Sequence, residues 1–105
     1  MAYTNALAAL ADPTRRAVFE RLREGPMGVG EIAETLPVSR PAVSQHLKVL
    51  KDAGLVADEP RGAARIYRIH AEGLRELRDW LDGFWDEALA NFKAHAERAE
   101  DGDEQ

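Results

Sequence analysis

The sequence predicts a mainly α-helical fold with one small β-hairpin. Apolar residues recur at three- and four-residue steps through most of the chain, which is the spacing of an amphipathic helix. Prolines and glycines lie where these patterns begin and end, as they do at helix termini. Two short segments, 55–59 and 65–70, read instead as strands joined by a turn that contains proline and glycine. At 105 residues the chain has the size of one domain.

The first half of the chain predicts four helices. They are expected over 4–11, from Asp12-Pro13 to Gly25-Pro26, over 29–36, and over 39–53. The fourth has the clearest start, because Ser39 is a suitable N-cap and Val38 and Val43 have the spacing of a hydrophobic staple. Pro41 then falls in the first turn, where its missing N–H has no intrahelical partner. Gly54 is expected to end this helix in a left-handed conformation.

The last part of the chain predicts one long helix over 72–98. Its apolar stripe consists of Leu74, Leu77, Leu81, Phe84, Ala88 and Phe92. Residues 1–98 are therefore expected to form a single domain, and residues 99–105 an acidic, disordered tail.

The net charge of −5 is unevenly distributed. Residues 38–71 contain six basic and three acidic residues, a charge of +3, whereas residues 72–105 contain four basic and eleven acidic ones, a charge of −7. The net charge of the whole chain would argue against a polyanionic partner, but the basic segment 38–71 permits one.

The fourth helix has a polar face that lacks carboxylates. On a helical wheel Val43, Leu47 and Leu50 share one face, with His46 at its edge. The opposite face consists of Pro41, Ser44, Gln45 and Lys48, flanked by Arg40 and Lys51. A solvated helix usually mixes Glu and Lys, whereas hydroxyl, amide and cationic groups are those that reach base edges and phosphates. This face indicates DNA binding, with an ordinary surface helix as the alternative.

A short helix, a tight turn, a second helix and a basic hairpin make a helix-turn-helix with a wing. The sequence resembles the ArsR family of winged helix-turn-helix repressors of bacteria and archaea. The matching segments are ALADPTRRAVFERL within 8–22, VGEIAETLPVSRPAVSQHLKVLKDAGLV at 29–56 and RGAARIYRI at 61–69. The absence of cysteine and a long last helix with Trp80 and Trp85 resemble the autorepressor-like branch of that family.

The resemblance implies a sequence-specific repressor that binds a palindromic operator in double-stranded DNA. Residues 39–53 would be the recognition helix and the hairpin the wing. The implied DNA-binding residues are Ser39, Arg40, Pro41, Ser44, Gln45, His46 and Lys48 in the helix, with Arg61 and Arg65 in the wing. The wheel position of His46 favours a structural or phosphate-contacting role over base reading.

The resemblance also implies a homodimer, and the apolar stripe supports one. Trp80 and Trp85 widen this stripe beyond what one small domain can bury. The expected interface residues are Leu7, Leu10, Leu74, Leu77, Leu81, Phe84, Trp85, Ala88 and Phe92. A small-molecule pocket at the tryptophans is an open alternative, and no effector is predicted.

The residue types in this sequence predict neither a metal site nor a cofactor. Thiolate ligands are absent, and the last helix offers only His95 near Glu97, with His70 before it. The other acidic residues of this helix are expected to form a solvated face. A metal-responsive repressor with a non-thiolate site is the less favoured alternative.

An enzyme is not expected. Ser44 and His46 are two residues apart, so on a helix they point to different faces, and no nucleophile or phosphate-binding motif is present. The main alternative is a winged helix that binds proteins and not DNA. The chain has neither a long apolar run nor a signal peptide, so a cytoplasmic location without membrane contact is expected.

Overall fold

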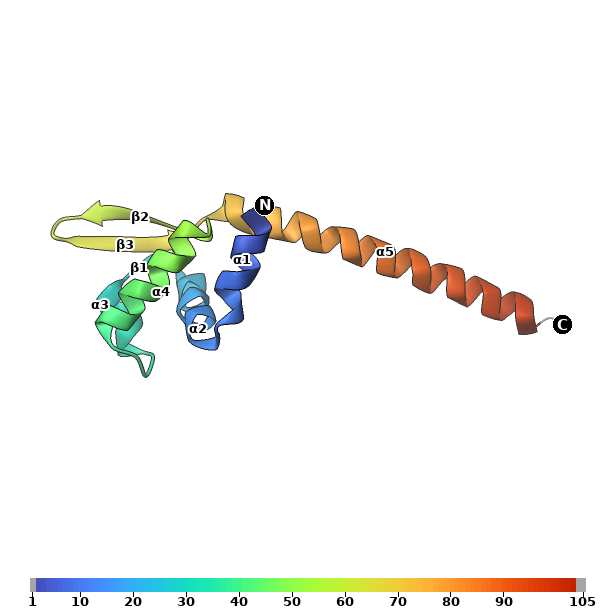
Figure 1. The fold of residues 1–105 in the computed structure, drawn as a ribbon, viewed down its shortest axis with the longest axis horizontal. Helices are drawn as coiled ribbons and strands as arrows, with labels where there is room; N and C mark the ends of the chain where they lie inside the picture. Colours follow the sequence, from blue (N-terminus) through green and yellow to red (C-terminus); the bar gives the residue numbers. More distant parts are fainter. Residues whose placement is uncertain (1, 104–105) are drawn as a thin grey trace.

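The described chain folds into five α-helices and a small antiparallel sheet of three strands (Figure 1). The computed structural model describes the backbone of residues 2–103 and the side chains of residues 4–99. The elements are α1 (Ala2–Ala11), α2 (Pro13–Arg21), a 3₁₀ turn (Leu22–Glu24), β1 (Met27–Gly28), α3 (Val29–Glu34), α4 (Arg40–Asp52), β2 (Val56–Arg61), β3 (Ala64–Ile69) and α5 (Ala71–Asp103). The predicted fold class is therefore confirmed.

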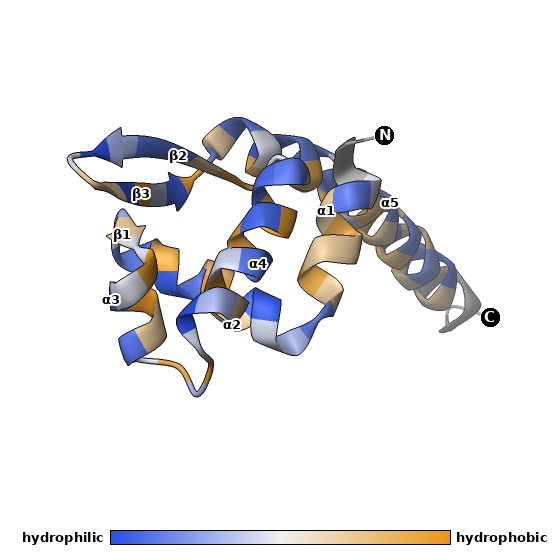
Figure 2. Ribbon diagram, turned by 60° about the vertical axis from the view of Figure 1, so that its left-hand side comes forward, coloured by the Kyte–Doolittle hydropathy of each residue, from blue (hydrophilic) through white to orange (hydrophobic). Residues whose placement is uncertain are grey.

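Helix α4 is the central element of the fold. It packs against α1, α2, α3 and strand β2, and its buried side chains Val43, Leu47 and Leu50 are fully inaccessible to solvent. In Figure 2 the ribbon of α4 alternates between hydrophobic and hydrophilic residues along its length. Because each such side chain stabilises the fold by about 1.5–3 kcal/mol on burial, the core determines which face of α4 remains exposed.

The sheet contains a strand that the sequence did not predict. The strand order is β1-β3-β2, and β1 pairs with β3 through Met27 opposite Tyr67 and Gly28 opposite Ile66. A strand of two residues is too short to show alternation, and it exists only because β3 supplies its partner. The β2–β3 hairpin projects from the helices, and Gly62 at its tip has a φ of 61°.

Helix α5 is longer than predicted. It continues to Asp103, so residues 99–103 are helical where a disordered tail was expected, and residues 104–105 lie outside the described residues. Ala99 and Glu100 are good helix formers, whereas Asp101, Gly102 and Asp103 are poor ones, so propensity alone does not explain the continuation to Asp103. The third predicted helix is shorter than expected, since α3 ends at Glu34.

One end of α5 is attached to the C-terminal end of α4. The N–H of His70 donates to the carbonyl oxygen of Leu55 at 2.9 Å, and Gly73 of α5 lies directly against the carbonyl of Gly54. Further along, α5 packs against α1 and then extends away from the helices on the side opposite to the hairpin (Figure 1). The molecule consequently measures 73 Å in its longest dimension.

Candidate nucleic-acid interface

Helix α4 begins where the sequence predicts. The hydroxyl oxygen of Ser39 accepts a hydrogen bond from the N–H of Ala42 at 3.3 Å, and Ser39 has extended backbone angles. Pro41 is accommodated in the first turn. The N–H of Val43 donates to the carbonyl of Ser39 at 3.0 Å, so the first complete backbone bond of the helix forms directly after the proline. The N-cap prediction is confirmed.

Arg40 extends from the start of α4 over α3. A Cβ atom placed on Gly30 would lie 3.1 Å from Nη2 of Arg40, so this glycine leaves room for the guanidinium group. Arg40 itself is exposed. The two helices therefore meet with a cation at their outer edge.

The predicted polar face of α4 is exposed along its length. Ser39, Arg40, Pro41, Ser44, Gln45 and Lys48 all face solvent. Within residues 4–99, the side chains of Ser44, Gln45 and Lys48 have no hydrogen-bond or ion-pair partner in the protein. An amide, a hydroxyl and an ammonium group thus remain available for acceptors outside the chain.

His46 lies apart from this face. It is half-buried, and it is near Asp12 at the start of α2. The N–H of Arg15 donates to the Asp12 carboxylate at 2.8 Å, which lowers the pKa of Asp12, and the positive charges of Arg15 and His46 lower that pKa further. This position is compatible with the structural or phosphate-contacting role that the helical wheel favoured for His46 over base reading.

The wing, which is the β2–β3 hairpin, presents three arginines. Arg61 and Arg68 are exposed, and among residues 4–99 neither has a hydrogen-bond or ion-pair partner. The sequence prediction included Arg61 but not Arg68. Arg65, also predicted, is exposed but already has a partner: its Nε lies 2.7 Å from Oδ2 of Asp58.

Asp58 joins the wing to helix α4. Its other oxygen, Oδ1, lies 2.8 Å from Nζ of Lys51 in the last turn of α4. Hydrogen bonds from Lys51 and Arg65 lower the pKa of Asp58, so the carboxylate is ionised at neutral pH. The sequence prediction missed Asp58, and an acidic residue inside the most basic segment was the available signal.

The apolar stripe of α5 is divided between the chain's own core and solvent. Leu77 is buried, and Leu10 and Leu74 pack against the core, so these three have little surface left for a partner. The exposed remainder of the predicted interface consists of Leu7 of α1 and, on α5, Leu81, Phe84, Trp85, Ala88 and Phe92, together with Leu89, which the prediction omitted. Their exposed fractions rise to 73% at Phe92.

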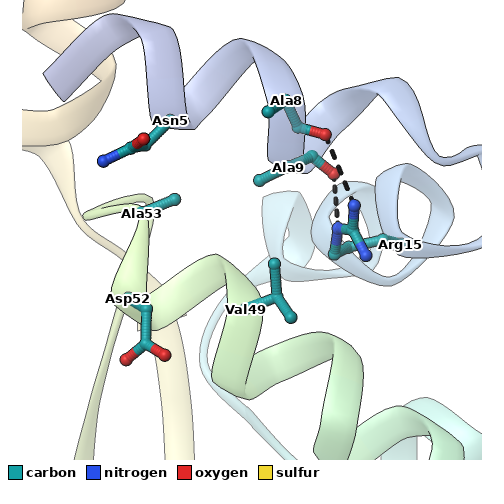
Figure 3. A pocket seen from close by; sticks show the side chains of 7 residues that line it. All are labelled: Asn5, Ala8, Ala9, Arg15, Val49, Asp52 and Ala53. Carbon is teal, nitrogen blue, oxygen red and sulfur yellow. Dashed lines mark hydrogen bonds between the residues drawn. The ribbon is translucent and has the colours of Figure 1, made fainter. Parts of the chain in front are cut away.

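A shallow hollow of about 290 Å³ separates α1 from the outer side of α4 (Figure 3). Arg15 crosses its edge and donates to the carbonyls of Ala9 at 2.6 Å and Ala8 at 3.3 Å. These carbonyls belong to the last turn of α1, which has no intrahelical donors for them. Arg15 is therefore used to cap α1, and the other polar side chains that line the hollow are Asn5 and Asp52.

Neither a metal cluster nor a membrane helix is found within the described part of the chain. No three histidine, aspartate or glutamate side chains there are grouped closely enough to hold an ion. None of the helices in that part combines the length and apolar character needed to span a bilayer.

Known proteins are similar to this chain in sequence. The helix-turn-helix domain family matches residues 10–59. The HTH-type transcriptional regulator Rv2034 of Mycobacterium tuberculosis is 61% identical over 80% of this chain and 78% of its own length. The transcriptional repressor SdpR of Bacillus subtilis is 35% identical over 76% of this chain and 89% of its own length.

Solved structures show the same architecture. An ArsR-like transcriptional regulator from Rhodococcus sp. RHA1 is 30% identical with a TM-score of 0.71, over 88% of this chain and 90% of that one. The homodimeric winged helix-turn-helix DNA-binding domain of Mb0332 from Mycobacterium bovis is 28% identical with a TM-score of 0.66, over 84% of this chain and 82% of that one.

The fold, the exposed polar face of α4 and the similarity to known regulators together define a winged helix-turn-helix transcriptional regulator. The chain belongs to the ArsR family, as its sequence motifs predicted.

Proposed function

We propose that the protein is a repressor that binds a palindromic operator as a homodimer. The observation that carries the proposal is the outward face of α4, where Ser44, Gln45 and Lys48 have no partner within residues 4–99 and no carboxylate lies among them. Such groups match the acceptors of base edges and phosphates in the major groove. Occupation of a promoter by this face would block transcription, and the proposal assigns no catalytic activity.

The exposed stripe of α5 supports the homodimer. Leu81, Phe84, Trp85, Leu89 and Phe92 are at least half exposed, an arrangement that is unfavourable in water for a monomer. Pairing of two α5 helices would cover the stripe. Two recognition helices about 34–36 Å apart would then enter successive major grooves on one face of the DNA.

Selection of bound duplexes from random DNA tests the proposal. We expect an inverted repeat whose half-site centres are about 10–10.5 base pairs apart. Affinity should fall steeply with salt, by about one power of salt concentration for each phosphate neutralised. A selection without enrichment, together with salt-insensitive binding to a protein, would indicate the protein-binding alternative instead. A promoter to which the enriched sequence maps would identify the regulated gene.

A further inference from the structure

We propose that Asp58 is a positioning residue for DNA specificity: it joins Lys51 of α4 to Arg65 of the wing, so that the protein favours its operator over other DNA. This inference rests on the proposed DNA-binding function. We refer to these three residues as the Asp58 clamp.

The geometry of the clamp is that of a buried anion beneath two surface cations. The Asp58 side chain is only 6% exposed, whereas Lys51 and Arg65 are 49% and 55% exposed. Both carboxylate oxygens are used, Oδ1 by Lys51 and Oδ2 by Arg65. In the β2–β3 ladder Asp58 lies two positions from Pro60, the residue opposite Arg65, so Asp58 and Arg65 lie on the same face of the hairpin.

The clamp spans the junction between the two DNA-binding elements. Lys51 is in the last turn of α4 and Asp58 is in β2, with the turn through Gly54 between them. The wing projects beyond the helices (Figure 1), so its angle to α4 depends on contacts near its base. The Lys51–Asp58 ion pair crosses that turn and opposes rotation of the wing about it, while the Arg65–Asp58 pair, which lies within the hairpin, holds the shared carboxylate in place.

The charge of the clamp affects the two modes of DNA binding differently. Non-specific affinity depends on the number of cations available to phosphates. Asp58 partly neutralises two cations and so lowers this affinity. Specific binding depends on whether helix and wing lie in register with the groove and the backbone, which the clamp favours. Loss of Asp58 should therefore increase non-specific binding and decrease selectivity.

The test compares Asp58→Asn with Glu59→Gln in the full chain. Glu59 is the exposed neighbour in β2 and has no ion-pair partner within residues 4–99, so its substitution removes the same charge without opening the clamp. Fluorescence anisotropy gives the affinity for the selected operator duplex and for a scrambled duplex at several salt concentrations. The ratio of the two affinities is the decisive quantity.

For Asp58→Asn we expect the operator-to-scrambled ratio to fall about tenfold or more, out of the roughly 10³–10⁷ typical of specific binders. The salt slope on the scrambled duplex should become steeper by about one, because released cations reach phosphates. Glu59→Gln should leave the ratio within about twofold of that of the wild type. An unchanged ratio in Asp58→Asn, or an equal fall in Glu59→Gln, would overturn the proposal.

Lys51→Gln removes the Lys51–Asp58 ion pair and leaves Asp58 in place. This variant tests the proposal even if Asp58→Asn does not fold. Lys51 is half exposed, so this variant should keep the wild-type melting temperature and still lose selectivity. A wild-type ratio in folded Lys51→Gln would refute the clamp. If the wild-type protein itself shows no operator preference, the proposed function fails, which differs from failure of the clamp alone.

Discussion

At the scale of single residues, α4 separates side chains that hold the helix from side chains that face outward. Val43 and Leu47 are completely buried, whereas Ser44, Gln45 and Lys48 have no protein partner within residues 4–99. A buried residue determines where the helix lies, and an outward residue determines what it can bind. Because the two sets are distinct, substitutions on the outward face can change DNA recognition without unfolding the protein.

Gln45→Ala should change base preference with little effect on stability. The amide of Gln45 is exposed at the middle of the polar face, and glutamine can bond an adenine through two hydrogen bonds. Its loss should reduce discrimination at one base pair in each half-site by about 1–3 kcal/mol. Selection from random DNA measures this change, with Glu20→Ala on the exposed surface of α2 as the control. An unaltered consensus would show that Gln45 does not read a base.

Sequence reasoning predicted residues on regular elements better than contacts between elements. The helical wheel placed Pro41, Ser44, Gln45 and Lys48 on the polar face, flanked by Arg40, and all five lie at the surface. Ser39, which was predicted from the family resemblance, is exposed as well. The ion pairs of Asp58 could not be predicted in the same way. They require the end of α4 and both strands of the wing to meet in space, and no local spacing specifies that meeting.

At the scale of elements, Ser39 combines a structural role with a predicted DNA contact, and two substitutions separate them. Ser39→Ala removes the acceptor for the N–H of Ala42 and should lower stability by about 0.5–1 kcal/mol. Ser39→Asp retains an N-cap acceptor, so stability should be kept, but the added negative charge should repel phosphate. Urea unfolding and operator titration measure the two effects. Equal operator affinity of Ser39→Asp and wild type would exclude Ser39 from the DNA interface.

The attachment of α5 to α4 depends on the absence of a side chain at Gly73. A Cβ atom at this position would overlap the carbonyl of Gly54, and backbone cannot move aside as a flexible side chain can. Gly73→Ala should therefore lower the free energy of unfolding by about 2 kcal/mol or more, despite the higher helix propensity of alanine.

Gly83→Ala is the matched control for this substitution. It lies in the same helix, and a Cβ atom there would meet nothing within 4 Å, so stability should rise by up to about 1 kcal/mol. Denaturant unfolding of both variants measures the difference. An increase in the free energy of unfolding for both variants would show that α5 does not pack closely on the end of α4.

At the scale of the whole molecule, the fold places α5 partly outside its own domain. The helix has 33 residues, about 50 Å at 1.5 Å per residue, and only its first turns are covered by the core. Helical periodicity predicted the apolar stripe. It could not predict which leucines the chain buries itself and which remain exposed, because Leu77 and Leu81 occupy equivalent positions in the periodic pattern. The structure makes that division: Leu77 is 8% exposed and Leu81 is 50% exposed.

If the exposed stripe is the dimer interface, a charge placed on it should separate the subunits. Leu81→Glu puts a carboxylate among the exposed apolar side chains, where pairing would desolvate it. Ala90→Glu adds the same charge nine residues later, about 180° around the helix, on a face that is also exposed. Sedimentation velocity should show a monomer for the first variant and a dimer for the second.

The same pair of variants connects assembly with DNA binding. A monomer can occupy only one half-site, so Leu81→Glu should lose most of its affinity for the full operator, whereas its affinity for an isolated half-site should match that of the Ala90→Glu control. Equal loss on both DNA sequences would point to damage within the recognition unit and not to lost dimerisation. A Leu81→Glu variant that remains dimeric would place the interface on another surface, with the exposed Leu7 of α1 as the next residue to test.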